Sequence, residues 1–196
     1  MRIFGIDPGS KNTGYGCIDT EDGRFRFVVC GAVTVSPRLP FSERLAGIYD
    51  GLTSLLAKYQ PACVAIENVF YARNVSSALK LGHARGVAML AAAKAGLTVT
   101  EYAPTEVKRA VVGYGRADKT QVREMVMLLL GLDTTPSPDD ASDALAIAVC
   151  HANSAGGPPE TRVVSSGPRS WRQYRPRDRR PRGRIPDDRA AQGQDR

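Results

Sequence analysis

Two acidic residues end apolar runs, where a carboxylate is costly unless it is paired or bound to a cation, and two more share one face of a predicted helix. Asp7 ends the apolar run IFGI, and Glu67 ends a second apolar run, ACVAI. Asp140 and Asp143 are three residues apart in SPDDASDALAIAV, and this spacing puts both on one face of a helix. Grouped carboxylates suit Mg²⁺ or Mn²⁺, and two such ions assist the hydrolysis of a phosphodiester. The four acids are therefore a candidate metal site for that reaction.

Each acid also has a purely structural interpretation. Asp7 precedes Pro-Gly and would suit an ordinary turn, and Glu67 would suit the exposed end of a strand. Ser137 and Asp140 match a capping box, with Pro138 at the first helical position. Both interpretations are open for each residue taken alone. The metal interpretation requires that all four residues converge in space.

Hydrophobic patterning predicts the elements that would bring the acids together. Apolar and alternating runs predict strands at 2–7, 13–19, 25–35, 62–67 and 97–102. Helical spacing predicts helices at 40–59, 75–95, 105–112, 119–130 and 138–153. The first three strands are joined by short turns and should form an antiparallel meander. The order β-β-β-α-β-α-β-α predicts an α/β protein with a mixed five-stranded sheet flanked by helices.

The composition changes sharply after residue 153. Residues 154–196 are rich in Arg, Pro and Gly, and their eleven Arg and five acidic residues account for +6 of the formal net charge of +7. Such a segment has too few apolar anchors to fold, so we expect one domain at 1–153 and a disordered basic tail at 154–196. A basic tail favours a polyanionic partner.

Cysteine usage and hydropathy indicate a cytoplasmic protein. The four cysteines lie in apolar contexts without CxxC spacing, so we expect reduced core thiols. Asp7 interrupts the first apolar run too early for a signal peptide. No stretch reaches the roughly 20 apolar residues of a membrane span, so no membrane partner is expected.

Four segments stand out: GIDPGSKNTGYG, AIENVFYARNVSSALKLGHARGVA, VKRAVVGYGRADKTQV and DDASDALAIA. In this order and spacing they closely resemble the RuvC family of Holliday-junction resolvases, and the resemblance covers about residues 1–152. It implies a ribonuclease-H-like nuclease domain at 1–153. It also implies a homodimer that makes paired Mg²⁺- or Mn²⁺-dependent nicks across a four-way DNA junction during recombination and repair, with two ions per active site. Docking to the RuvA–RuvB branch-migration complex is implied by the resemblance alone.

The resemblance assigns residues position by position. The family's four acids match Asp7, Glu67, Asp140 and Asp143, which are then both catalytic and metal-binding. Its catalytically important lysines match Lys108 and Lys119. Surface lysines on helices are usually only solvated, but beside a metal site they would neutralise phosphates.

The segment directly after Glu67 is a candidate DNA contact. The family's junction-contacting aromatic residue matches Phe70, in ENVF. Phe70, Tyr71 and Arg73 fall in a predicted exposed loop, where an aromatic ring can stack on an unpaired base and Arg can bind phosphate. The alternative is that Phe70 folds back into the core.

The helix at 75–95 is rich in small residues, which allow another helix to approach closely. They are Ser76, Ala78, Gly82, Ala84 and Gly86. This face would serve internal packing or a subunit interface, and the family's dimer contact involves this region. His83 and His151 are expected to be structural.

Three other classes compete with a resolvase. GIDPGSKNTGYG looks like the first phosphate loop of actin-type ATPases, but no second such loop follows. A nuclease of the same fold that acts on ribosomal RNA precursors is a closer rival. In a non-catalytic nucleic-acid-binding module, the acids would merely cap.

Overall fold

Five strands form one mixed sheet in the computed structural model, which describes residues 1–68 and 75–154. They are β1 (Arg2–Asp7), β2 (Asn12–Glu21), β3 (Arg24–Thr34), β4 (Cys63–Glu67) and β5 (Thr98–Tyr102). Their spatial order is β3-β2-β1-β4-β5. The first three strands are antiparallel, and β4 runs parallel to both β1 and β5. The predicted meander and mixed five-stranded sheet are confirmed.

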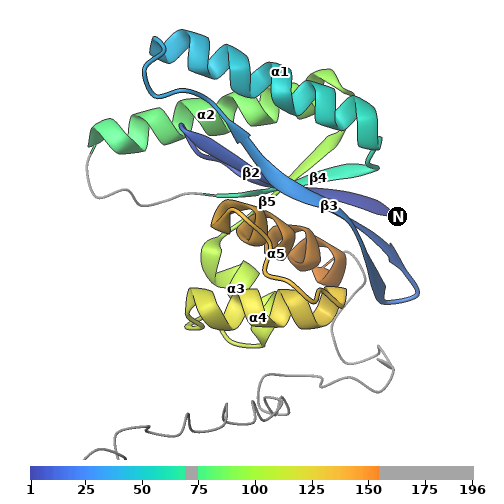
Figure 1. Cartoon of the computed structure of the whole chain (residues 1–196). Coiled ribbons are helices and arrows are strands. Elements are labelled where there is room, and N and C mark those ends of the chain that lie inside the picture. The colour runs from blue at the N-terminus through green and yellow to red at the C-terminus, as the bar shows by residue number, and fades with distance from the viewer. Residues whose placement is uncertain (69–74, 155–196) are drawn as a thin grey trace, which may run out of the picture.

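Helices cover both faces of the sheet (Figure 1). One face carries α1 (Phe41–Tyr59) and α2 (Val75–Lys94). The other carries α3 (Pro104–Val112), α4 (Lys119–Leu130) and α5 (Asp139–Ser154). All ten predicted elements are present, with boundaries within two residues of those expected.

Alternation along β1 and β4 decides which face of the sheet receives the acids. Phe4 and Ile6 pack in the core beneath α1 and α2, whereas Ile3 packs in the core beneath α3, α4 and α5. Successive side chains of a strand point to opposite faces, so Asp7 belongs to the α5 side. The same alternation in β4 puts Glu67 on that side as well.

Glycines let α5 lie directly on the backbone of β1 and β2. A Cβ atom at Gly5 would lie 2.1 Å from the carbonyl oxygen of Ala144, and one at Gly14 would lie 2.1 Å from the carbonyl oxygen of Asp140. No side chain larger than hydrogen fits at these contacts without displacing the helix. Because Gly14 pairs with Asp7 across the β1–β2 ladder, the first turn of α5 is placed beside Asp7.

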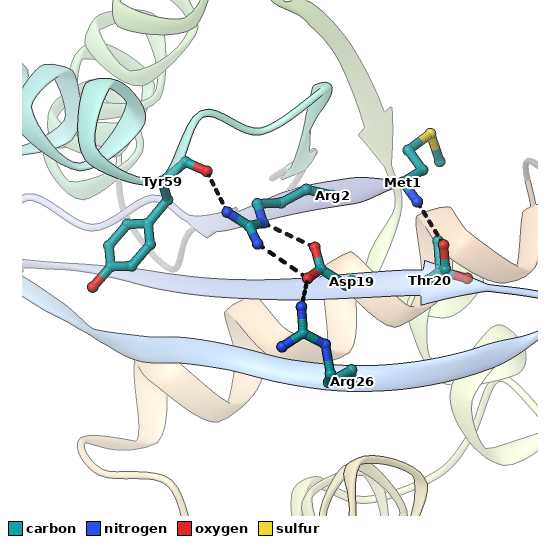
Figure 2. Close-up of polar contacts among 6 residues, drawn as sticks. All are labelled: Met1, Arg2, Asp19, Thr20, Arg26 and Tyr59. Carbon is teal, nitrogen blue, oxygen red and sulfur yellow. Dashed lines mark hydrogen bonds and ion pairs between the residues drawn. The ribbon is translucent and has the colours of Figure 1, made fainter.

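The opposite end of β1 carries a satisfied ionic cluster (Figure 2). The Arg2 guanidinium donates through Nε and Nη2 to the Asp19 carboxylate at 2.8 and 3.1 Å, and through Nη1 to the Tyr59 carbonyl at 2.9 Å. Arg26 donates to the same carboxylate. The hydrogen bond from Arg2, with help from Arg26, holds the pKa of Asp19 below its usual value.

The cysteines are free thiols, as predicted: Cys17, Cys63 and Cys150 are buried, and Cys30 is half-buried. Burial raises the pKa of Cys17 and of Cys150 to about 12, so these thiols are inert. Among the described residues, no helix has the length and apolar character needed to cross a membrane. From residue 155 on, the predicted tail lies outside the described residues.

Candidate active site

Asp7 and Glu67 end two neighbouring parallel strands. Ile6 of β1 pairs with Ile66 of β4, so the next residue along each strand is an acid that faces α5. The peptide group that joins Glu67 to Asn68 is held by hydrogen bonds at both its carbonyl and its N–H. Its carbonyl accepts a hydrogen bond from Arg85 Nε at 3.3 Å, and the N–H of Asn68 donates to the carbonyl of Tyr102 in β5 at 2.7 Å. The end of β4, which carries the Glu67 carboxylate, is therefore held by both α2 and β5.

Asp140 and Asp143 reach the same edge on the first turns of α5. The helix begins at Asp139, one residue later than a capping box on Ser137 would require. Within the described residues, the Asp140 side chain makes no hydrogen bond to a backbone N–H. The structure therefore gives Asp140 no capping role, and its backbone lies instead against Gly14, the partner of Asp7.

The four acids are electrostatically coupled. Burial raises the pKa of Asp7 to about 8, and the negative charges of Glu67, Asp143 and Asp140 contribute to the rise. Burial and the charge of Asp143 also raise the pKa of Glu67. Like charges held together in this way disfavour ionisation of their neighbours unless a cation offsets them.

The two predicted lysines lie among these acids. Lys119, the first residue of α4, donates from Nζ to Asp143 Oδ2 at 2.9 Å, and this hydrogen bond raises the pKa of Lys119. The charge of Lys119 offsets part of the rise in the pKa of Asp7 and of Glu67, and the charge of Lys108 offsets part of the rise in the pKa of Glu67. The Lys119 side chain is 76% exposed, so it is accessible from solvent at the rim of the site.

The four carboxylates are the type of ligand that a hard divalent cation binds, although these side chains are not gathered around a single point. Within residues 1–68 and 75–154, no three His, Cys, Asp or Glu side chains are grouped as a metal site. Asp143 is held by Lys119 instead. Four carboxylates are the ligand type that Mg²⁺ and Mn²⁺ prefer. A bound cation would favour the ionised form of Asp7 and would thereby lower its raised pKa.

Several residues near the site were not identified from the sequence. Arg85, which holds the Glu67 carbonyl, has no distinguishing pattern in its helix. Arg123 of α4 is ion-paired, with its Nη1 2.9 Å from Asp139 Oδ1. Lys119 and Arg123 on α4 have the same four-residue spacing as Asp139 and Asp143 on α5. That matched spacing was a usable signal for the pairing of the two helices.

The predicted DNA-contacting residues Phe70, Tyr71 and Arg73 lie in the segment 69–74, outside the described residues. His151 is structural, as expected. Its Nδ1 lies 2.9 Å from the Tyr102 hydroxyl and its Nε2 lies 3.3 Å from Cys63 Sγ. Burial lowers the pKa of His151, so the ring is neutral at pH 7.

An apolar groove of about 510 Å³ lies between α1 and α2. The small residues of α2 divide between two roles: Ala84 is fully buried, whereas Cβ atoms at Gly82 and Gly86 would meet open space. Leu79 is 58% exposed and Leu90 is 50% exposed. The groove is lined by Leu45, Ala78, Leu79, Gly82, His83, Gly86, Val87 and Leu90.

A mixed sheet in this order, with acids at the ends of β1 and β4 and on α5, is typical of nucleases of ribonuclease-H-like fold. The family model for crossover junction endodeoxyribonuclease RuvC matches residues 3–151. The crossover junction endodeoxyribonuclease RuvC of Chloroflexus aggregans is 52% identical over 155 residues, which are 79% of this chain and 94% of that protein. The chain belongs to the RuvC family of crossover junction endodeoxyribonucleases.

Solved structures agree with this assignment. The Thermus thermophilus RuvC in complex with Holliday junction substrate is 38% identical and superposes with a TM-score of 0.76, over 79% of this chain and 94% of that one. The yeast mitochondrial Holliday junction resolvase Ydc2, at 15% identity and a TM-score of 0.58 over 77% of each chain, shares the fold. Because the chain belongs to the RuvC family, an actin-type ATPase and a nuclease that acts on ribosomal RNA precursors are no longer preferred interpretations.

Proposed function

We propose that this chain resolves four-way DNA junctions, during homologous recombination and repair, by metal-dependent hydrolysis of phosphodiester bonds. The observation that carries the proposal is Asp7, a half-buried acid whose pKa is raised to about 8 beside three further acids, in a chain of the RuvC family. The relative from Thermus thermophilus supports the substrate class, because it was solved with a Holliday junction.

Asp7, Glu67, Asp140 and Asp143 are the proposed ligands of one or two Mg²⁺ or Mn²⁺ ions. When bound, such ions lower the pKa of the attacking water and offset charge on the phosphate. Two of the acids are held by rigid strands and two by α5, which lies against the sheet backbone at Gly5 and Gly14. This arrangement fixes the carboxylates relative to one another before any substrate arrives.

Lys108 and Lys119 are the proposed phosphate-neutralising residues. Both exert their positive charge on Glu67, and Lys119 also does so on Asp7. A cation at this rim would attract the DNA backbone, so binding should weaken as salt rises. Phe70, Tyr71 and Arg73 are proposed to contact the junction from the segment that follows Glu67. Phe70→Ala should weaken cleavage and leave the thermal midpoint unchanged.

A second copy of the chain is the proposed occupant of the groove between α1 and α2. Paired nicks need two active sites, and exposed Leu79 and Leu90 offer an apolar contact. Leu79→Glu should yield monomers in sedimentation equilibrium. The matched control is Leu128→Glu on α4, since Leu128 is 38% exposed and lies on the other helical layer. A wild-type monomer at micromolar concentration would contradict the dimer.

The cellular setting is proposed from family membership. We place the reaction in the cytoplasm, with the RuvA–RuvB branch-migration complex as a partner. The 154–196 tail, with its net charge of +6, is a proposed accessory DNA contact. Removal of the tail should lower junction affinity at low salt and leave the cutting rate of bound junction unchanged.

One experiment tests the central proposal. The protein is incubated with a synthetic four-way junction or with linear duplex of the same sequence, with and without Mg²⁺. We expect cutting of the junction alone and only with the metal. Equal cutting of the duplex would indicate a general nuclease. Binding without cutting in Mg²⁺ and in Mn²⁺ would indicate a non-catalytic binding module.

A further inference from the structure

Arg44 is a buried cation without an anionic partner. Only 8% of the residue is exposed, and none of the ion pairs within the described residues involves it. Its Nε is buried and lacks a hydrogen-bond partner within the part of the chain that the structure describes. Burying a charge in this way is expensive unless the charge is compensated.

The position of Arg44 in its helix does not compensate the charge. Arg44 lies in the first turn of α1, where the helix dipole favours anions and disfavours cations. Phe41 offers a partial compensation, since its ring centre lies 5.4 Å from Arg44 Cζ. The general stability of α1 therefore does not explain a guanidinium at this place.

The Arg44 side chain makes one hydrogen bond within the described residues, and that bond indicates a different role. Its Nη2 donates to the backbone carbonyl of Ser10. Ser10 lies in the connection between β1 and β2, three residues after Asp7. The guanidinium thus holds the backbone path that leaves the first acid of the proposed active site.

Three consecutive carbonyls of this connection are each held from a different element. The Gly9 carbonyl accepts from the buried Thr13 hydroxyl of β2 at 2.8 Å, and the Lys11 carbonyl accepts from Val35 N–H, after β3, at 3.0 Å. The Ser10 carbonyl, between them, accepts from Arg44. Of these three donors, only Arg44 belongs to a helix. Its hydrogen bond therefore fixes the position of the β1–β2 connection relative to α1.

We propose that Arg44 is a positioning residue: it fixes residues 9–11 and thereby the direction in which the Asp7 carboxylate leaves β1. This proposal rests on the proposed junction-cutting function. Arg44 acts through the Ser10 backbone and touches no substrate. Its loss should lower the rate of the chemical step and leave junction binding unchanged.

Arg44→Met tests the proposal, because it keeps the apolar stem and removes the guanidinium. We expect kcat for junction cutting to fall by about 10- to 100-fold, the range for a misplacement of about 1 Å at a reacting group. KM for the junction should stay at the wild-type value. Amide exchange should quicken in residues 9–12 and stay unchanged in β4. Arg38→Met, at an exposed arginine before α1, is the matched control and should change none of these quantities.

Three results would overturn the proposal. The first is a folded Arg44→Met protein with wild-type kcat. The second is a loss confined to KM or junction affinity, which would put the guanidinium on a DNA phosphate. The third is faster exchange throughout the chain, which would make Arg44 a general stabiliser.

Arg44→Lys decides the matter if the Met variant does not fold. An ammonium keeps the charge and one donor, so kcat and exchange in residues 9–12 should lie between wild type and complete loss. A fall in kcat with unchanged exchange in residues 9–12 would overturn the proposal. The exchange measurement needs no activity. If the wild-type protein does not cut junctions, the proposed function fails while the role of Arg44 at Ser10 is still tested.

Discussion

The two ends of β1 carry carboxylates in opposite electrostatic situations. Where the strand begins, Arg2 pairs with Asp19 of β2, and two guanidinium groups contact that carboxylate (Figure 2). Where it ends, Asp7 pairs with Gly14, and the nearby charges include three more acids. The pKa of Asp19 is lowered, whereas that of Asp7 is raised to about 8.

We infer from this contrast that the start of the six-residue strand β1 serves stability and that its end serves the proposed active site. Asp19 is compensated by its neighbours, so it supports the fold and has little capacity left for a ligand. Asp7 lies among like charges, so its ionised form lowers folding stability and would be favoured by a bound cation. Perturbed pKa values gather at functional sites, so this arrangement supports the proposed role of Asp7 in cation binding.

The largest expected effect comes from Asp7→Asn. Loss of one carboxylate ligand should lower junction cutting by at least about 10³-fold, since metal assistance is worth several kcal/mol. Junction binding should persist. The metal-free variant should be more stable than wild type at pH 7 by about 1 kcal/mol or more, because one pKa unit corresponds to about 1.4 kcal/mol. Single-turnover cleavage and urea unfolding in EDTA measure the two effects. Cutting in Mg²⁺ at the wild-type rate would refute the proposed ligand set.

The next effect tests how α5 delivers its acids. Gly14→Ala would place a Cβ atom against the Asp140 carbonyl, so the first turn of α5 must shift. We expect cutting to fall by about 10- to 100-fold and stability by about 1–3 kcal/mol. Gly115→Ala is the control, since its Cβ atom would meet its nearest neighbour at an ordinary 3.4 Å. Normal cutting by a destabilised Gly14→Ala protein would mean that the position of Asp140 is not critical.

The two ends of β1 should also respond to pH with opposite signs. The folded-state pKa of Asp7, about 8, exceeds its ordinary 3.8, so metal-free stability should fall as pH rises from about 4 to about 8. The pKa of Asp19 is lowered from 3.8, so its contribution should be lost as pH falls below about 4.

Urea midpoints in EDTA between pH 3 and pH 9 measure both slopes. In Asp7→Asn, folding stability should fall less steeply as pH rises toward 9. A smaller fall should remain, because the pKa of Glu67 is also raised. Added Mg²⁺ should flatten the wild-type slope. An unchanged slope in Asp7→Asn would show that Asp7 is ionised in the folded protein without metal.

Asp19→Asn should have the smallest effect. It removes the shared partner of Arg2 and Arg26, which are partly exposed, so the thermal midpoint should fall by less than in Gly14→Ala. Junction cutting at a temperature where both proteins are folded should equal that of wild type. A loss of cutting would show that the two ends of β1 are not independent.

The sequence predicted the sheet, its helices and the edge where the acids gather, because these depend on local patterns. The runs that end in Asp7 and Glu67 are strands by alternation and length, and the Asp140–Asp143 spacing is helical. The contacts that finish the site are not local. Arg44 and Ser10 are 34 residues apart, Lys119 and Asp143 are 24 apart, and Gly14 meets Asp140 across most of the domain. No periodicity encodes such contacts, since they arise when helices pack on the sheet.

The contact of α5 with Gly5 and Gly14 also has a consequence for the order in which the protein is made. Asp140 and Asp143 follow Asp7 by about 130 residues, so a ribosome adds them much later. Until α5 has emerged, the bare glycine surface of β1 and β2 is uncovered, and half of the proposed ligands are missing. The docking of α5 therefore closes the core and completes the acidic cluster in one step, so a nascent chain gains its proposed cutting site only once α5 has packed on the sheet.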